Sequence, residues 1–354
     1  MKKIFLLLIG LFLWFTGSSQ SCLPQGITFS TQSQIDSFPT NYPNCTQIEG
    51  DVTISGTDIT NLNGLSVLTS IGGDLNIVSN PFLISLTGLE KVISIVGWLY
   101  IVNNSSLTSL TGLDSLTSIG GNLDIVNTIA LTSLTGLEKL TSIGGGLEIS
   151  DNNALTSLAG LDNLTSIGGN LYIFYNYALT SLTGLKKVNT IGIGIVIQGN
   201  SILTSLTGLD NIAAASITGL YILENYSLST CAVKSVCDYL GNMNGFIEIF
   251  NNATGCNSQA EVDTACKTLS VENLILDDVV SIFPNPSSDK ITIETSPTPT
   301  KSQLSLMNLN GQQLITRQIT EPKTQLDISS LPSGVYFVRL TTDRMVEVEK
   351  FVKQ

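Results

Sequence analysis

A seven-residue block occurs seven times in this 354-residue chain, each time 24 residues after its previous occurrence. It reads LTSLTGL four times and a close variant three times, and the copies begin at Ile59, Leu83, Leu107, Leu131, Leu155, Leu179 and Leu203. A fixed period of this length is typical of folds in which each repeat buries its apolar side chains against its neighbours. The period therefore predicts a stacked-repeat architecture over residues 51–230.

The residues within one unit favour strands over helices. Each unit contains Thr, Ser and at least two Gly, which weaken helix interiors. A helix pair with its turns would also need about 33 residues. In segments such as Leu123–Ile125, apolar residues alternate with a polar one, as a half-buried strand requires. We predict an all-β fold, a solenoid with one 24-residue coil per unit.

Three columns of the repeat are expected to have structural roles. Two Gly columns are expected to mark bends with positive φ; they comprise Gly64, Gly88, Gly112, Gly136, Gly160, Gly184 and Gly208, and Gly73, Gly97, Gly121, Gly145 and Gly169. An Asn column is expected to bond turn backbone and its own neighbours; it comprises Asn80, Asn104, Asn152, Asn176 and Asn200, with Thr128 as the exception. After Leu203 the period slips by one residue, at Leu220–Ile222.

The two ends of the array carry export signals and cysteines. Residues 1–20 have two lysines, a short apolar run and small polar residues, which predicts a signal peptide. The run is too short for a comfortable membrane span, and no later segment reaches 18 apolar residues, so no transmembrane segment is expected. The residues before Cys22 make a poor lipoprotein signal.

All six cysteines lie outside the repeats. They are Cys22, Cys45, Cys231, Cys237, Cys256 and Cys266. Because an oxidising compartment favours disulfides that staple small caps, we expect an N-terminal cap over 21–50, closed by Cys22–Cys45, and a C-terminal cap over 231–270. The other four cysteines allow three pairings. A zinc site is disfavoured, because the chain has no His and the spacings are not CxxC, and no metal or other cofactor is expected.

A small β-sandwich is predicted after a linker at 271–280, because short alternating segments separated by turn residues follow one another there. Four stretches resemble the type A sorting domain of the type IX secretion system used by Bacteroidetes: SIFPNPSSDKITIE from Ser281, the turn Asn308–Gln312, LPSGVYFVRL from Leu331, and the terminal KFVKQ. The resemblance implies a sorting domain over 281–354 that engages the secretion machinery and exports its passenger to the cell surface or medium. The matching sorting-signal residues are Pro284, Asn285, Pro286, Gly334, Tyr336, Lys350 and Lys353.

The repeat unit LTSLTGL…LTSIGG-LxI-xxN is similar to bacterial relatives of the receptor L domain, within the leucine-rich-repeat group. The resemblance covers residues 48–269 and implies a right-handed β-helix closed by a cap. It names no ligand. The block is LxxLxxL rather than LxxLxL, which separates the array from ordinary leucine-rich repeats.

Catalytic residues are scarce in the repeats. The chain has no His, and residues 51–230 have no Arg and no Cys, so a Ser-His-Asp triad is impossible. Asp124 and Glu148 occupy equivalent positions on successive coils, at about 5 Å, a separation that would suit a retaining glycosidase. No cleft is indicated around them, and we predict that the protein is not an enzyme.

Aromatic residues on the LxI strands suggest a binding face for an extracellular protein or glycan. The candidates are Trp98, Tyr100, Tyr172, Phe174 and Tyr221. Within 51–230, 12 Asp and Glu against 4 Lys leave a net charge of −8, which makes nucleic acid a poor partner. We therefore expect an exported, non-catalytic binding or adhesion protein. The alternatives are a self-associating surface component, a carbohydrate-active enzyme, and an ice-binding protein using the Thr column at 108, 132, 156, 180 and 204.

Overall fold

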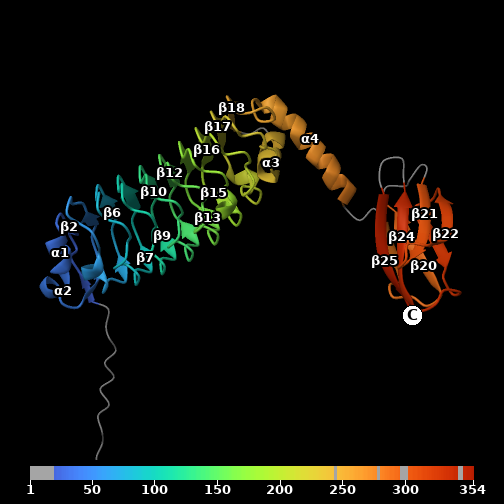
Figure 1. Ribbon diagram of the computed structural model, residues 1–354, viewed down its shortest axis with the longest axis horizontal. Helices are drawn as coiled ribbons and strands as arrows, with labels where there is room; N and C mark the ends of the chain where they lie inside the picture. The colour runs from blue at the N-terminus through green and yellow to red at the C-terminus, as the bar shows by residue number, and fades with distance from the viewer. Residues whose placement is uncertain (1–19, 243–244, 277–279, 296–301, 342–345) are drawn as a thin grey trace, which may run out of the picture. The chain divides into compact units, whose positions relative to one another are not determined.

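A computed structural model describes residues 20–242, 245–276, 280–295, 302–341 and 346–354 (Figure 1). The chain divides into two compact units, 1–266 and 267–354, which are described separately. The signal peptide expected at 1–20 lies outside the described residues except for Gln20. In the described part of the chain, no helix is both long and apolar enough to span a bilayer.

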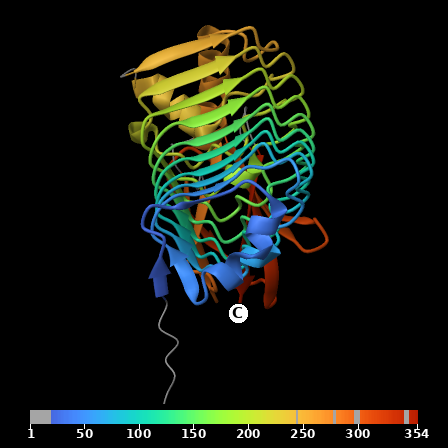
Figure 2. The same cartoon turned by 90° about the vertical axis from the view of Figure 1, so that its left-hand side faces the viewer.

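The first unit is the predicted β-solenoid, and its coils stack as parallel rungs (Figure 2). Each coil contributes a strand to one of two parallel sheets, and every coil except the last two also contributes a strand to the other. The short-strand sheet contains β1 (Gln20–Cys22), β3 (Cys45–Ile48), β5 (Ser70–Ile71), β7 (Ser94–Ile95), β9 (Ser118–Ile119), β11 (Ser142–Ile143), β13 (Ser166–Ile167) and β15 (Thr190–Ile191). The long-strand sheet contains β2 (Ile27–Phe29), β4 (Val52–Ile54), β6 (Leu75–Val78), β8 (Leu99–Val102), β10 (Leu123–Val126), β12 (Leu147–Ser150), β14 (Leu171–Phe174), β16 (Gly194–Gln198), β17 (Gly219–Leu223) and β18 (Phe246–Phe250).

The register of the sheets follows the sequence period. Leu123 pairs with Leu99 on one side and with Leu147 on the other, so equivalent residues of successive units stack directly. The slip near Leu220 is absorbed in a turn that contains the short 3-10 helix η3 (Ala214–Ser216), and Ile195 then pairs with Leu220. A one-residue insertion therefore leaves the sheet intact.

The same apolar residues of each coil face the interior. In one coil these are Leu131, Leu134, Leu137, Leu140, Ile143, Leu147 and Ile149, all at most 1 % exposed. Each fully buried aliphatic side chain contributes roughly 1.5–3 kcal/mol relative to exposure. Since every coil repeats this set, a single continuous core runs through the array.

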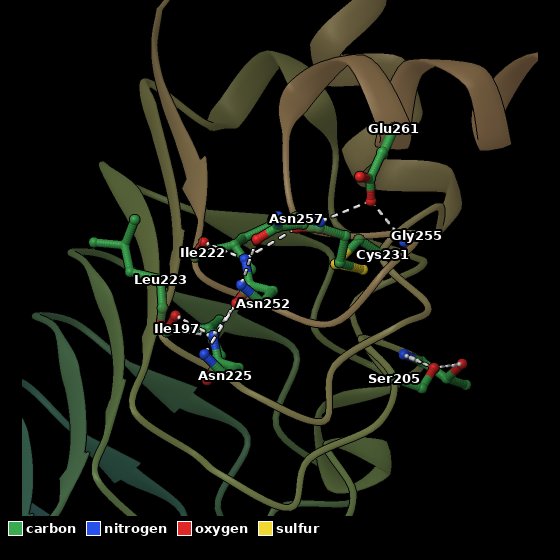
Figure 3. The surroundings of a disulfide bond; sticks show 12 residues. Ile197, Ser205, Ile222, Leu223, Asn225, Cys231, Asn252, Gly255, Asn257 and Glu261 are labelled. Carbon is green, nitrogen blue, oxygen red and sulfur yellow. Dashed lines mark hydrogen bonds between the residues drawn. A yellow bond between two sulfur atoms is a disulfide. The ribbon is translucent and has the colours of Figure 1, made fainter.

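A buried ladder of asparagines joins the coils at one corner. Asn152 Oδ1 accepts from Thr128 N at 2.9 Å, and Asn152 Nδ2 donates to Ile125 O at 2.8 Å. The ladder continues to the last coils, where Asn225 Nδ2 donates to Asn252 Oδ1 at 3.1 Å (Figure 3). These side chains satisfy backbone groups that would otherwise be buried without partners.

The two Gly columns require glycine for different physical reasons. Gly88, Gly112, Gly136, Gly160 and Gly208 have φ between +113° and +117°, as expected for bends, but the expectation is wrong for Gly64 and Gly184, which lie in 3-10 helices and do not have positive φ. The second column, which includes Gly97 and Gly145, does not have positive φ; a Cβ there would collide with the preceding coil. At Gly145 the clash would include Asn122 N at 2.8 Å. Close approach between coils, rather than a left-handed bend, therefore explains the second column.

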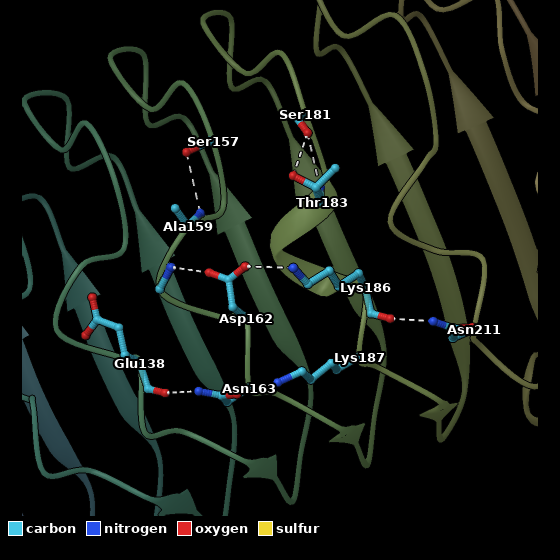
Figure 4. Close-up of polar contacts among 11 residues, drawn as sticks. Glu138, Ser157, Ala159, Asp162, Asn163, Ser181, Thr183, Lys186, Lys187 and Asn211 are labelled. Atoms are coloured by element: carbon cyan, nitrogen blue, oxygen red, sulfur yellow. Dashed lines mark hydrogen bonds and ion pairs between the residues drawn. The ribbon is translucent and has the colours of Figure 1, made fainter.

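The LTGL corner is stabilised by polar contacts between neighbouring coils (Figure 4). Asp162 accepts from Gly160 N at 3.2 Å and lies 3.9 Å from Lys186 Nζ. Asn163 Nδ2 donates to Glu138 O at 2.7 Å, and Lys187 Nζ donates to Asn163 Oδ1 at 2.6 Å. Two of these corners form 3-10 helices, η1 (Asn63–Leu65) and η2 (Thr183–Leu185).

Helices and disulfides close both ends of the solenoid. The N-terminal end carries α1 (Gln32–Asp36) and α2 (Phe38–Asn41), and the C-terminal end carries α3 (Lys234–Asn242) and α4 (Gln259–Leu276). The structure joins Cys22 to Cys45, Cys231 to Cys256 and Cys237 to Cys266. Of the three pairings that the sequence left open for the last four cysteines, the structure therefore has Cys231–Cys256 with Cys237–Cys266. Helix α4 extends into the segment at 271–280 that was expected to be a linker.

The second unit contains two antiparallel sheets around a separate core. One sheet contains β19 (Val280–Phe283), β20 (Lys290–Thr295) and β23 (Lys323–Asp327). The other contains β22 (Gln313–Ile319), β21 (Ser302–Asn308), β24 (Gly334–Thr341) and β25 (Val346–Lys353). Both sheets contribute to this core, for example through Ile291 and Val338, as the predicted β-sandwich requires.

Candidate recognition face

The outward positions of the long-strand sheet bring most of the candidate binding residues together. Strand pairing places Tyr100, Asp124, Glu148 and Tyr172 side by side on β8, β10, β12 and β14. We call these four residues the aromatic–carboxylate row. Because neighbouring strands lie about 4.8 Å apart, Tyr100 and Tyr172 are separated by roughly 14 Å along the row.

Trp98 and Tyr100 form an aromatic pair at one end of the row. Their ring centroids lie 5.3 Å apart in an edge-to-face arrangement, and Trp98 is 43 % exposed. The Trp98 backbone N donates to Asp74 Oδ1 at 2.7 Å. The indole lies over Gly121 of the next coil, where a Cβ would overlap its ring. The Gly column thus leaves space for this side chain.

Tyr172 and Phe174 form a second aromatic pair at the other end. Their rings are stacked with centroids 5.2 Å apart, because both side chains project outward from β14 two residues apart. Tyr175 and Tyr177 extend this group around the adjacent corner, with successive centroids 6.5 Å apart. Tyr177 is 51 % exposed, so the aromatic surface reaches solvent.

The two carboxyl groups lie between the aromatic pairs. Burial, with a further contribution from the charge of Glu148, raises the pKa of Asp124 to about 6. Glu148 Oε1 accepts from Ser150 Oγ at 2.8 Å. Burial and then the charges of Asp124, Asp74 and Glu148 raise the pKa of the Tyr100 hydroxyl. These shifts show that the row is partly desolvated and has a negative local field.

Tyr221 lies apart from the row. It is on β17, and Val196 on β16 separates it from Tyr172. Its other neighbour is Glu248 on β18. Four of the five candidate binding residues, Trp98, Tyr100, Tyr172 and Phe174, therefore flank the carboxyl pair, and Tyr221 does not.

In the Thr column considered for ice binding, the hydroxyls of Thr108, Thr156 and Thr180 donate to backbone of the preceding coil. Thr180 Oγ1 donates to Thr156 O at 3.0 Å, and Thr108 Oγ1 donates to Ile84 O at 3.3 Å. Among the residues that the structure describes, no group of three or more His, Cys, Asp or Glu is arranged to hold a metal ion.

A groove on the short-strand sheet was not anticipated from the sequence. It has a volume of about 610 Å³ and is lined by the repeated Ser, Ile and Gly of five coils, between Ser94 and Gly192. The Ser-Ile-Gly pattern of three successive coils could have indicated it, since Ser and Gly side chains are too small to cover the sheet surface. Val96, 65 % exposed, replaces Gly at one end of the groove.

The predicted sorting-signal residues cluster in the second unit. Asn285 donates to Lys350 O at 3.0 Å and accepts from Val352 N at 2.9 Å, so the Pro284–Pro286 segment is fastened to β25. Gly334 pairs with Lys353 across β24 and β25. Tyr336 donates to Pro332 O at 2.8 Å and stacks on Phe351. Lys353 is only 8 % exposed, whereas Lys350 is exposed.

Comparison with known families agrees with this division. Residues 281–354 match the family model described as secretion system C-terminal sorting domain, and residues 117–213 match the receptor L domain. The second match includes Asp124, Glu148 and Tyr172 but not Trp98 or Tyr100. Among curated proteins, none matches the chain. The sorting domain indicates type IX export, and both families are non-catalytic. The chain is thus a secreted, cell-surface protein that carries a solenoid similar to the receptor L domain and a type IX sorting domain.

Proposed function

We propose that the protein is a non-catalytic recognition module of the cell surface and that its ligand contacts the aromatic–carboxylate row. The sorting domain delivers the solenoid outside the cell, and the solenoid presents the row on a rigid sheet. Binding sites on rigid elements lose little conformational freedom when a ligand is bound.

The observation that carries this proposal is the placement of two aromatic pairs on either side of two carboxyl groups. Aromatic side chains offer large contact areas at low entropic cost, and carboxylates between them fix the orientation of a ligand. The outward residues that border the row on either side, Asn76 and Val196, carry neither a ring nor a charge. The row is therefore separated from the other aromatic and acidic residues of its sheet, such as Tyr221 and Glu248.

Glycoside hydrolysis is the second candidate, because Asp124 has a pKa near 6 and lies beside another carboxyl group. A raised pKa suits a general acid, and the spacing of one strand suits a retaining mechanism. However, the row lies on an open sheet face, and the 610 Å³ groove lies on the other sheet. Recognition without turnover is therefore the better-supported function.

The test is an array of extracellular proteins and glycans probed with the exported chain, residues 21–354. A Trp98→Ala/Tyr100→Ala/Tyr172→Ala variant is probed in parallel. A Phe82→Ala/Tyr226→Ala variant is the matched control, because both side chains are more than half exposed and lie outside the row. We expect specific signals that the triple variant loses and the control keeps.

Equal loss in the control would contradict a recognition site at the row. No signal from any protein would favour a structural component that associates with itself, which sedimentation at increasing concentration would detect. Product formation from an arrayed glycan, abolished by Glu148→Gln, would replace recognition with hydrolysis.

A further inference from the structure

We infer that the aromatic–carboxylate row recognises a cationic group, the guanidinium of an arginine side chain on a protein partner. This inference rests on the proposed function and adds to it the chemical class of the ligand. The charge of the face, the geometry of the row and its protonation behaviour each support the inference.

The long-strand sheet has one sign of charge. Its strands contain Asp124, Glu148 and Glu248 and neither Lys nor Arg, and Asp74 immediately precedes β6. The lysines of the repeats are all near the LTGL corner, where Lys186 lies near Asp162 and Lys187 donates to Asn163 (Figure 4). No cation of the sheet itself neutralises the row, so a positively charged ligand complements it.

The geometry of the row suits a planar cation. Two carboxyl groups on adjacent strands can accept several N–H donors from one guanidinium, and the flanking rings of Tyr100 and Tyr172 provide faces for it. An ammonium group offers neither the fork of donors nor the stacking plane. The row therefore favours arginine over lysine.

Protonation of the row is expected to control this binding. Asp124 faces Tyr100 on β8 and Glu148 on β12, so its charged form has an acidic neighbour and no cation beside it. A bound guanidinium would favour the ionised carboxylate. Because the pKa of Asp124 is about 6, affinity is expected to decrease as the pH falls through that value.

The chain contains its own reporter for a binding experiment. It has two tryptophans, and Trp14 lies in the predicted signal peptide, so Trp98 is the only tryptophan of residues 21–354. Its fluorescence is followed while the exported chain is titrated with a capped hexa-arginine peptide at fixed ionic strength. Hexa-lysine, hexaglucosamine and neutral cellohexaose are titrated in parallel. Arginine stays charged throughout, so any pH effect between 5 and 8 originates in the protein.

We expect saturable binding of hexa-arginine, several-fold weaker binding of hexa-lysine, and an affinity at pH 5 up to about tenfold below that at pH 8. Asp124→Asn/Glu148→Gln should weaken hexa-arginine binding at least tenfold at pH 8. The control, Asp58→Asn/Glu321→Gln, removes the same charge at two exposed residues outside the row and should have little effect.

Three results would overturn the inference. The first is equal weakening of hexa-arginine binding in the control variant, which would show general attraction to an acidic protein. The second is the absence of a fluorescence response to hexa-arginine up to about 1 mM. The third is tighter binding of hexaglucosamine or cellohexaose than of hexa-arginine. In that last case the proposed recognition face would stand with a glycan ligand, provided that the aromatic triple variant lost the response.

Discussion

The two sheets of the solenoid come from the same 24-residue repeat, yet their outward positions differ. The short-strand sheet presents Ser at one position in five successive coils, from Ser70 to Ser166, and Thr190 in the next. The long-strand sheet presents a different sequence at its outward position, with Asn76, Tyr100, Asp124, Glu148, Tyr172 and Val196 in turn. Inward Ile recurs in both sheets, and inward Leu recurs in the long-strand sheet.

This difference distinguishes positions whose residue type is fixed by coil stacking from positions at which many residue types are tolerated. Positions that contact the backbone of the preceding coil, such as Asn152 and Gly145, tolerate few other residues. An outward residue of a long strand contacts other side chains, on its own strand or on the neighbouring coils, and not the backbone of the next coil's turn. Different residue types therefore occur at the outward positions of the long strands, and the aromatic–carboxylate row occupies these positions.

The largest expected effect is at the asparagine ladder. Asn152→Ala would leave the buried Thr128 N and Ile125 O without their present partners, at about 1–3 kcal/mol each, so we expect a loss of about 2–6 kcal/mol in the free energy of unfolding. Urea unfolding followed by Trp98 fluorescence measures it. Glu148→Gln on the free outward column should change stability by no more than about 0.5 kcal/mol. Similar losses in both variants would contradict the comparison.

Two glycines of the same column are expected to respond differently. In Gly145→Ala, the new Cβ meets backbone of the preceding coil, so about 1–3 kcal/mol of stability should be lost. In Gly121→Ala it meets the Trp98 indole, which can rotate away. We therefore expect a smaller stability loss, a shift in Trp98 emission and weaker ligand binding. Unchanged emission in Gly121→Ala would refute the placement of the indole.

A third prediction concerns pH and Asp124. Its pKa is about 6 in the folded protein and 3.8 in the unfolded reference, so the folded state holds the proton more tightly and its stability falls as pH rises between these values. Asp124→Asn removes this effect. Because the carboxyl group is only half buried, we expect a gain on the order of 1 kcal/mol above pH 6 that disappears below pH 4. Urea unfolding at pH 4 and pH 8 tests this, and a less stable variant at pH 8 would contradict it.

The smallest expected effect is at the one irregular rung of the ladder. Thr128 donates to Val126 O at 3.4 Å within its own coil, whereas the next residue of the column, Asn152, bonds the coils on both sides. Thr128→Asn should complete the ladder and raise stability by about 0.5–1 kcal/mol. Thr128→Ala is the control and should lower it. No gain in the asparagine variant would indicate that this corner cannot accommodate the longer side chain.

Much of the fold could be predicted because residues that recur at the same position of every repeat must occupy equivalent places in successive coils. Coil length, the LxI strands, the inward Leu and Ile, and the strands of the second unit follow from period and alternation. The backbone conformation of the residue before each ladder Asn was not predicted from the sequence. It adopts positive φ at Ser79, Asn103, Asp151 and Tyr175, among others, and Gly is rare there, so the usual sequence signal is missing.

The candidate site was only partly predictable. Period alone placed Tyr100, Asp124, Glu148 and Tyr172 in one column, because equivalent positions must stack. The pKa of Asp124 and the position of the Trp98 indole over Gly121 depend on side-chain packing between coils, which a linear pattern does not contain. The groove was missed because Ile-Gly-Gly was interpreted only as a corner.

The register of the long-strand sheet makes the spacing of its surface groups discrete. Deleting residues 131–154, one whole period, would keep Leu123 stacked on an equivalent leucine, Leu171, and would bring Asp124 directly beside Tyr172. Duplicating the same residues would add a carboxylate and lengthen the row by about 4.8 Å. Insertion or deletion of whole periods therefore changes the distance between contact groups in steps of one coil and leaves the stacking of the core residues unchanged.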